Sequence, residues 1–395
     1  MSQRNLLILL AAFVLLGVVV VVAQRSRAPS TAQGSAFVPG LESALNDLER
    51  VALVKAGNEA VATLERRDGA WVVVEKNNYP ADVAKLRQQL RALAEAKILE
   101  QKTATPELYD RLGVVDVSAP TATGIAVSFT AAGKALPTVI LGDAQGSKYR
   151  YARRAGDEQS YLLDHDPNFP HGTGQWLAPT IIDVNSERVQ QVTIKHPDGE
   201  TITISKPTAR LQNYDVAGVP KGRELLYPGV ANVSANALRE LNLEDVQPAP
   251  PAAASADKPA SADKPAPADT LAAAGKPIRV EFRTFDGLIL DVTGTKQDDS
   301  AWITVAARFD ADQAARFAPA AGTPAPAADP NLPPEANPPA AEPAAAAAPA
   351  ASAAERAAEV EQINKRTAGW RYKIAAFQYD QMTRRMSDLL KPPAG

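Results

Sequence analysis

The 395-residue chain has no cysteine and only three histidines. Without cysteine there can be no disulfide, no thiolate metal site and no cysteine nucleophile. Lysine plus arginine (42) nearly balance aspartate plus glutamate (45), and no segment is strongly basic, which disfavours nucleic acid as a partner. The phosphate-loop pattern is missing, and no GxSxG or SxxK motif lies in a suitable setting. These absences predict a protein that is not an enzyme and has no cofactor or metal site.

One long apolar run stands out, at the N-terminus. Residues 6–23 read LLILLAAFVLLGVVVVVA, which is long enough to cross a hydrocarbon core of roughly 30 Å as a helix. We expect a short tail at 1–5, a transmembrane helix at 6–24 and a juxtamembrane segment at 25–49. Cleavage as a signal peptide after Ala23 is the alternative, but the length of the run favours a retained anchor.

The orientation of this anchor follows from the size of the body behind it. Arg25 and Arg27 argue mildly for a cytoplasmic body, yet long domains cross the membrane largely regardless of nearby charge. We therefore expect a single-pass protein of the bacterial inner (cytoplasmic) membrane, with an extracytoplasmic, periplasmic body.

Two segments rich in alanine and proline interrupt the body. They are a linker at 247–276 and an insertion at 311–364. Proline at this density favours extended conformations, and neither composition supplies a core, so we expect both to be disordered.

Turn signals recur between runs of alternating apolar residues. Asp-Gly pairs at Asp68-Gly69, Asp198-Gly199 and Asp286-Gly287 each predict a β-hairpin. A strand led by Trp71 and another led by Trp370 each run into a predicted helix. This pattern predicts three hairpin-plus-helix units that share one repeated design.

The expected fold class is α+β, with these repeated units and an antiparallel meander behind the transmembrane helix. Short loops between apolar segments predict the meander. The boundaries are 50–118 for the first hairpin-helix unit, 119–180 for the meander, 181–246 for the second unit, and 277–310 with 365–395 for the third.

Several of these segments resemble one known family, the domain of unknown function 4340. The matching segments are GAWVVVEKNNYPADVAKLRQQLRAL, YDRLGV at 109–114, VILGD followed by KYRYARR, QWLAPTIIDV and the terminal GWRYKIAAFQYDQMTRRMSDLL. The resemblance implies a membrane-anchored extracytoplasmic protein encoded beside ABC-2-type transporter genes and a gliding-motility-like auxiliary subunit. It supplies no catalytic residues.

One strand is the best candidate for an exposed ligand or partner surface because it mixes tyrosine with arginine. Its residues are Tyr149, Arg150, Tyr151, Arg153 and Arg154, and guanidinium groups suit anionic ligands. His165 and His171, with Asp164 and Asp166, are a weaker alternative, because the loop LLDHDPNFPHGTGQW gives metal ligands no fixed spacing.

We therefore expect a non-catalytic, membrane-anchored accessory or scaffold subunit of an ABC-type export or envelope assembly. The resemblance alone suggests an ABC-transporter permease and ATPase as partners. The alternatives are an independent envelope polymer-binding protein and, third, a periplasmic hydrolase.

Overall fold

The computed structural model describes residues 33–133, 135–250, 276–297, 300–317 and 353–392. The chain divides into two compact units between Ala178 and Pro179. We call the described residues up to Ala178 the first unit and those from Pro179 onward the second unit. The expected transmembrane helix lies outside the described residues, and no helix within them combines the length and apolarity that a membrane span needs.

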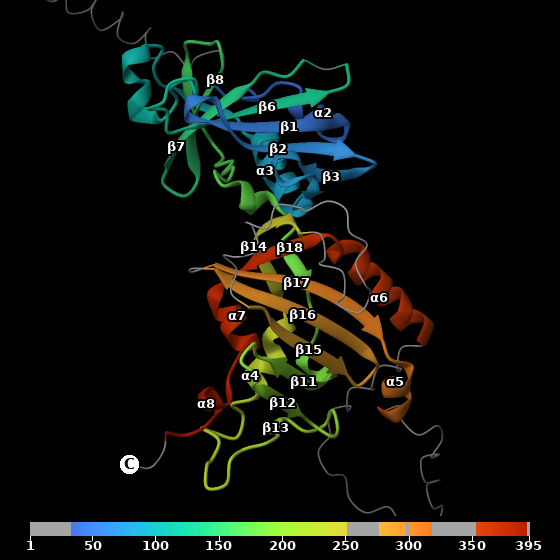
Figure 1. Cartoon of the computed structure of the whole chain (residues 1–395). Helices are drawn as coiled ribbons and strands as arrows, with labels where there is room; N and C mark the ends of the chain where they lie inside the picture. Colours follow the sequence, from blue (N-terminus) through green and yellow to red (C-terminus); the bar gives the residue numbers. More distant parts are fainter. Residues whose placement is uncertain (1–32, 134, 251–275, 298–299, 318–352, 393–395) are drawn as a thin grey trace, which may run out of the picture. The chain divides into compact units, whose positions relative to one another are not determined.

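The first unit is a nine-stranded sheet of antiparallel neighbours, in the order β4-β3-β2-β1-β6-β7-β8-β9-β5 (Figure 1). Its helices are α2 (Leu41–Ala44) and α3 (Val83–Glu95), and its strands are β1 (Leu48–Lys55), β2 (Glu59–Arg67), β3 (Ala70–Val73), β4 (Tyr79–Pro80), β5 (Ile98–Gln101), β6 (Ile125–Ala131), β7 (Val139–Gln145), β8 (Tyr149–Arg154) and β9 (Ser160–Leu163).

Helix α3 closes the core of this unit. The Asp82 side chain caps the helix by accepting a hydrogen bond of 3.0 Å from the backbone N–H of Lys85. Leu86, Leu90 and Leu93 form a buried stripe at helical spacing. Helix α3 therefore packs this stripe over part of one sheet face.

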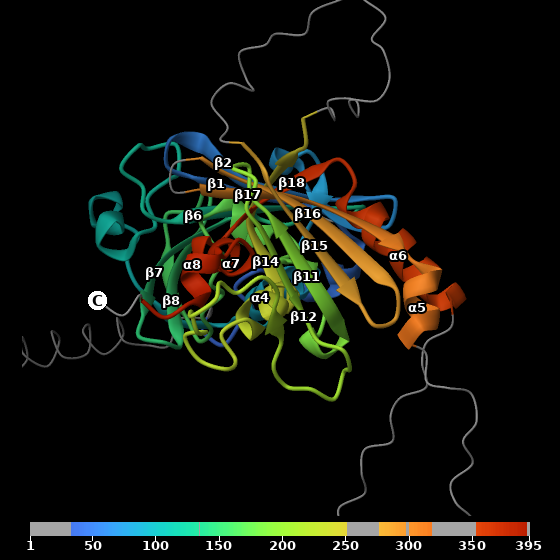
Figure 2. The ribbon, with the colours of Figure 1, turned by 60° about the horizontal axis from the view of Figure 1, so that its bottom comes forward.

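The second unit is also a nine-stranded antiparallel sheet, in the order β10-β14-β18-β17-β16-β15-β11-β12-β13 (Figures 1 and 2). Its strands are β10 (Thr180–Ile182), β11 (Val189–Lys195), β12 (Thr201–Ser205), β13 (Asp215–Val216), β14 (Leu241–Pro248), β15 (Ile278–Thr284), β16 (Leu288–Gln297), β17 (Ser300–Phe309) and β18 (Trp370–Ile374), and its helices are α4 (Asn232–Ala235), α5 (Ala311–Phe317), α6 (Ala353–Thr367), α7 (Ala376–Met382) and α8 (Met386–Leu389).

Helix α6 lies beside β17 in both views. Strand β18 pairs with β17 only from Ala301 to Ile303, which leaves the rest of that edge open. The Asn364 side chain completes it, because its Oδ1 accepts from the N–H of Ala307 and its Nδ2 donates to the C=O of Ala307, each at 2.8 Å. The helix thus covers a strand edge that would otherwise expose unpaired backbone groups.

The two sheets repeat one topology. Leaving aside the edge strands β4 and β10, the first reads β3-β2-β1-β6-β7-β8-β9-β5 and the second reads β13-β12-β11-β15-β16-β17-β18-β14. In both, three strands come first, then a helical segment, then a strand at the far edge, and then four successive strands between them. Every strand of one series therefore has a counterpart in the other.

Irregularities of register confirm this correspondence. The pairing of β1 with β6 shifts just after Leu48, and the pairing of β11 with β15 shifts just after Val189. A second shift follows Ile98 in the pairing of β5 with β9, and another follows Leu243 in that of β14 with β18. Because bulges are specific features of a fold, these two matching shifts place the strands around them in equivalent register. The shifts in the pairings of β1 with β2 and of β7 with β8 have no counterpart in the second unit.

The correspondence leaves a faint trace in the sequence. Strand β6 begins IAVSF and strand β15 begins IRVEF, and the register places Phe129 and Phe282 at equivalent positions. Tyr161 in β9 and Tyr372 in β18 are also equivalent.

The expected set of three hairpin-helix units needs correction. Each Asp-Gly pair does form a hairpin turn, with a positive φ at Gly69, Gly199 and Gly287. The turns join β2 to β3, β11 to β12, and β15 to β16, which are three different places in the shared topology. Asp-Gly suits any tight hairpin, so it marks turns and not repeats.

Two expected boundaries also change. Phe37 and Leu41, within the expected juxtamembrane segment, are fully buried in the first unit. The ends of the expected insertion are helical, as α5 and as most of α6. The fold class remains α+β, and the strands of 277–310 and 365–395 complete the sheet that 181–246 begins.

Candidate functional site

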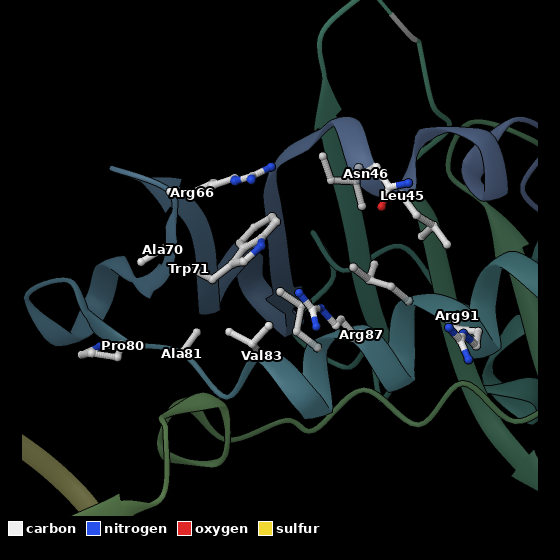
Figure 3. A pocket seen from close by; sticks show the side chains of 14 residues that line it. Leu45, Asn46, Arg66, Ala70, Trp71, Pro80, Ala81, Val83, Arg87 and Arg91 are labelled. Atoms are coloured by element: carbon white, nitrogen blue, oxygen red, sulfur yellow. The ribbon is translucent and has the colours of Figure 1, made fainter.

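The first unit carries a groove between helix α3 and the hairpin of β2 and β3 (Figure 3). Its volume is about 750 Å³, within the range of ligand pockets. Leu48, Leu86 and Leu90 supply an apolar floor. The floor exists because α3 covers only part of the sheet face.

A cross-strand pair stands at the mouth of this groove. The two-residue turn at Asp68-Gly69 places Arg66 directly opposite Trp71, and side chains at such positions lie side by side on one face. Trp71 is half-buried and Arg66 is exposed. The ring and the guanidinium therefore both face the groove.

Two more arginines reach the groove from α3. Arg87 and Arg91 are exposed and four residues apart, which puts them on the same helix face. Within the described residues, neither they nor Arg66 has a carboxylate within 4.0 Å. We call Arg66, Trp71, Arg87 and Arg91 the arginine groove. Arginine stays ionised at physiological pH, so three positive charges line the same groove as one tryptophan ring.

The lining of the groove offers hydrogen-bond donors and few acceptors. Apart from the three guanidinium groups and the indole N–H of Trp71, Asn46 is the one polar side chain among the described lining residues, and the one with an acceptor. A guanidinium group donates and cannot accept. The groove therefore suits a ligand that brings negative charge together with apolar surface.

The second unit has a counterpart of this site. Ile204 pairs with Val216, and the same register places Lys206 opposite Tyr214, where the first unit has Arg66 opposite Trp71. The Lys206 Nζ lies 4.7 Å from the centroid of the Tyr214 ring. The surrounding pocket has a volume of about 590 Å³. A cation beside an aromatic ring thus occurs at the same place in both units.

The pair in the second unit is buried. Lys206 is 4% exposed and Tyr214 is 3% exposed, and the Tyr214 hydroxyl donates to the carbonyl oxygens of Ser186 and Val189, at 2.8 and 2.7 Å. Burial raises the pKa of Tyr214 and lowers the pKa of Lys206. Here the cation packs against the ring and both are buried. In the first unit, Arg66 is exposed and Trp71 is half-buried.

The tyrosine and arginine strand expected to be an exposed surface is β8, and two of its arginines are buried. Arg150 is 9% exposed, makes an ion pair with Asp166 and donates to the carbonyl of Gly142 at 2.6 Å. Arg153 is 3% exposed and donates to the carbonyl of Val114 at 3.0 Å. The expectation of an exposed surface is corrected for these two residues, because their guanidinium groups donate to backbone carbonyls of the neighbouring strand β7 and of the loop that contains Val114.

Tyr149, Tyr151 and Arg154 of β8 are half-buried. Arg154 lies over the Phe37 and Tyr161 rings, 5.3 and 5.4 Å from their centroids, and donates to the carbonyl of Phe37 at 2.9 Å. Tyr149 and Tyr151 pack beside lysines. The strand holds the unit together at these positions.

The histidines do not come together. His165 makes an exposed contact of 2.9 Å with Asp164, and His171 is exposed. His196 is buried, with its Nε2 at 3.3 Å from the carbonyl oxygen of Arg384. Among the described residues, no group of three or more metal-ligating side chains is found.

Three of the motifs that carried the family resemblance, YDRLGV, VILGD and KYRYARR, meet inside the first unit. A Cβ on Gly142 would lie 2.1 Å from the carbonyl oxygen of Leu112, and a Cβ on Gly124 would lie 2.3 Å from that of Gly113. The YDRLGV and VILGD segments therefore pack backbone against backbone, which explains their glycines. Arg153 stacks over Tyr109 at 4.6 Å beside this contact.

Comparison with known proteins identifies the family. The model of the family described as "Domain of unknown function (DUF4340)" matches residues 71–265, so the segments that pack in the first unit belong to a recognised domain. Residues 71–265 belong to this family. No curated protein and no solved structure matches it.

The arginine groove is a site that the motifs did not reveal. Its signal was nevertheless present in the sequence. A two-residue turn at Asp68-Gly69 fixes Arg66 opposite Trp71, and Arg87 and Arg91 lie four residues apart on the wet face of the predicted helix.

Proposed function

We propose that this protein is a non-catalytic accessory or scaffold subunit, anchored in the bacterial inner membrane with its body outside the cytoplasm, in an ABC-type export or envelope assembly. The observation that carries the proposal is the arginine groove, since permanently charged donors around a half-buried tryptophan suit binding.

The anchor is proposed from the apolar run at residues 6–23. The link to a transporter permease and ATPase is proposed from the family resemblance. The duplicated sheet supports a scaffold, because each unit offers its own surface to other chains.

Purification of the full-length protein from native membranes in a mild detergent, followed by mass spectrometry, tests the proposal. A permease and an ATPase subunit should copurify. Recovery of the protein with neither subunit would contradict the export assembly, and retention on isolated peptidoglycan or polysaccharide would instead favour a polymer-binding protein.

A further inference from the structure

We propose that the arginine groove binds an acidic segment of a partner protein, with carboxylates on Arg66, Arg87 and Arg91 and an apolar side chain against Trp71. This inference rests on the proposed function, since it names the surface by which the scaffold holds a partner.

Charge is the first argument. The three guanidinium groups have no carboxylate within 4.0 Å among the described residues, although many other arginines of the chain do, such as Arg188 and Arg385. An exposed cluster of like charge is unfavourable by itself, and an anionic partner relieves it. Planar guanidinium groups also bind carboxylates through paired hydrogen bonds.

The chemistry of the lining argues against a neutral sugar. Sugar hydroxyls both donate and accept hydrogen bonds, and among the described lining residues only Asn46 offers a side-chain acceptor. The accessible apolar surface of the groove comes from Trp71, Pro80 and Val83, and an apolar partner would cover this surface from water. A peptide that alternates acidic and apolar residues supplies both kinds of group.

The spacing of the cations fits a peptide. Arg87 and Arg91 are one helical turn apart, so their Cβ atoms lie about 6 Å from each other. Alternate side chains of an extended peptide are separated by about 6.4 to 6.8 Å. Arg66 stands on the opposite wall, with Trp71 between it and the helix (Figure 3), so a bound segment would be held from both sides.

In the second unit, the residues at the same position are held by contacts within the chain itself. Lys206 lies against Tyr214, and the Tyr214 hydroxyl is hydrogen-bonded to the backbone. In the first unit, Arg66 and Trp71 stand at the corresponding positions and remain accessible. Because only the pair in the first unit is accessible, we assign the binding role to the first unit.

The test uses full-length protein in detergent and a fluorescein-labelled peptide of glutamate, leucine and phenylalanine, read by fluorescence polarisation. Matched peptides carry glutamine or lysine in place of glutamate. We expect the glutamate peptide to bind, the other two to bind at least tenfold more weakly, and added salt to weaken binding.

Variants of the groove then locate the binding. An exposed ion pair contributes about two- to fivefold in affinity, so Arg87→Glu with Arg91→Glu should weaken binding by tenfold or more. Arg87→Gln with Arg91→Gln should give a smaller loss, and Trp71→Ala should weaken binding more than Trp71→Phe. Arg111→Glu with Arg239→Glu, two exposed arginines outside the groove, should leave affinity unchanged. Circular dichroism checks that each variant is folded.

Three outcomes would overturn the inference. The first is equal binding of all three peptides, and the second is unchanged affinity in the folded groove variants. The third is arginine-dependent binding to phosphatidylglycerol vesicles without any binding of the glutamate peptide, which would make the groove a lipid site.

The inference and the proposed function can fail separately. If Arg87→Glu with Arg91→Glu still copurifies with the permease and ATPase, the groove is not the contact surface but the accessory role stands. If the wild-type protein copurifies with neither while the glutamate peptide binds through the arginines, the groove assignment stands and the export assembly does not.

Discussion

At the scale of single residues, exposure decides what a cation can do in this protein. Arg66 and Lys206 hold equivalent positions in the two sheets, yet Lys206 is buried against Tyr214 and Arg66 faces solvent. Arg153, in a strand that looked exposed, is almost fully enclosed. Residue type alone therefore does not distinguish a binding arginine from a structural one.

Replacing Arg153 should affect stability. Arg153→Ala removes hydrogen bonds to the carbonyl oxygens of Val114 and Asp157 and should lower the free energy of unfolding by about 1–3 kcal/mol. Urea denaturation measures the change. Arg66→Ala, at an exposed position, should change it by less than about 0.5 kcal/mol, and an equal loss in both variants would contradict this account.

Glycine at position 142 is required by close backbone packing. In Gly142→Ala the new Cβ would lie 2.1 Å from the Leu112 carbonyl oxygen and 2.8 Å from the Val114 Cγ1. Overpacking of this kind costs about 1–3 kcal/mol, so the thermal midpoint should fall. Gly172→Ala is the control, because its Cβ would meet only the exposed Gln175 side chain, at 3.2 Å from its Oε1, and no backbone atom. Equal midpoints for the two variants would argue against the packing.

At the scale of secondary structure elements, α6 completes the edge of the second sheet. Asn364→Ala would leave the N–H and C=O of Ala307 without their side-chain partners, which should cost about 1–3 kcal/mol. Hydrogen exchange of the Ala307 N–H should also be faster in this variant. Gln362→Ala, at an exposed position on the same helix, should leave both properties unchanged.

The attachment of α6 should also depend on pH. Arg188 donates to both carboxylate oxygens of Glu359 at 3.0 Å. Burial alone would raise the pKa of Glu359, but the hydrogen bonds and charges of Arg188 and Arg356 outweigh it and lower that pKa below its usual 4.5. A carboxyl with a lowered pKa in the folded state stabilises the fold above pH 4.5, and this stabilisation is lost as the pH falls further.

Thermal unfolding between pH 7 and pH 3 tests this dependence. The wild-type protein should lose stability below about pH 4.5, and Glu359→Gln should show a shallower loss because it lacks the titrating group. Glu361→Gln, at an exposed position on α6, is the matched control and should follow the wild-type curve. A Glu359→Gln curve as steep as that of the wild type would contradict the ion-pair anchor.

At the scale of the whole molecule, one sheet topology occurs twice with matching bulges. The two copies differ where function is proposed, in the hairpin and helix that surround the arginine groove. The first copy has the long helix α3, whereas the second has the four-residue α4 at that place. Divergence at one site on a shared frame is the expected result when only one copy retains a binding role.

The topology predicts which fragment can fold alone. A fragment of residues 33–178 contains a complete sheet and its covering helix and should unfold cooperatively, as measured by circular dichroism in urea. A fragment of residues 33–118 ends before β6, the partner of the buried strand β1, and should not fold. Cooperative unfolding of the shorter fragment would instead support a separate hairpin-helix unit.

Local chemistry determined much of this protein from its sequence. The Asp-Gly pairs fixed three hairpins, and the apolar stripe with the Asp82 cap fixed α3, because turn geometry and helix periodicity depend on neighbouring residues. The segments of the family resemblance were equally local. These signals place strands, turns and helices, and they cannot say which strands become neighbours.

The tertiary structure decided strand order, burial and the location of the site. The pairing of β1 with β6 spans a long stretch of chain, and whether Arg153 faces solvent depends on the loop containing Val114 that packs over it. The same long-range packing leaves Trp71 accessible and encloses Tyr214. Contacts between residues far apart in the chain set the environment of each side chain, and therefore only the folded chain distinguishes the arginine groove from its buried counterpart.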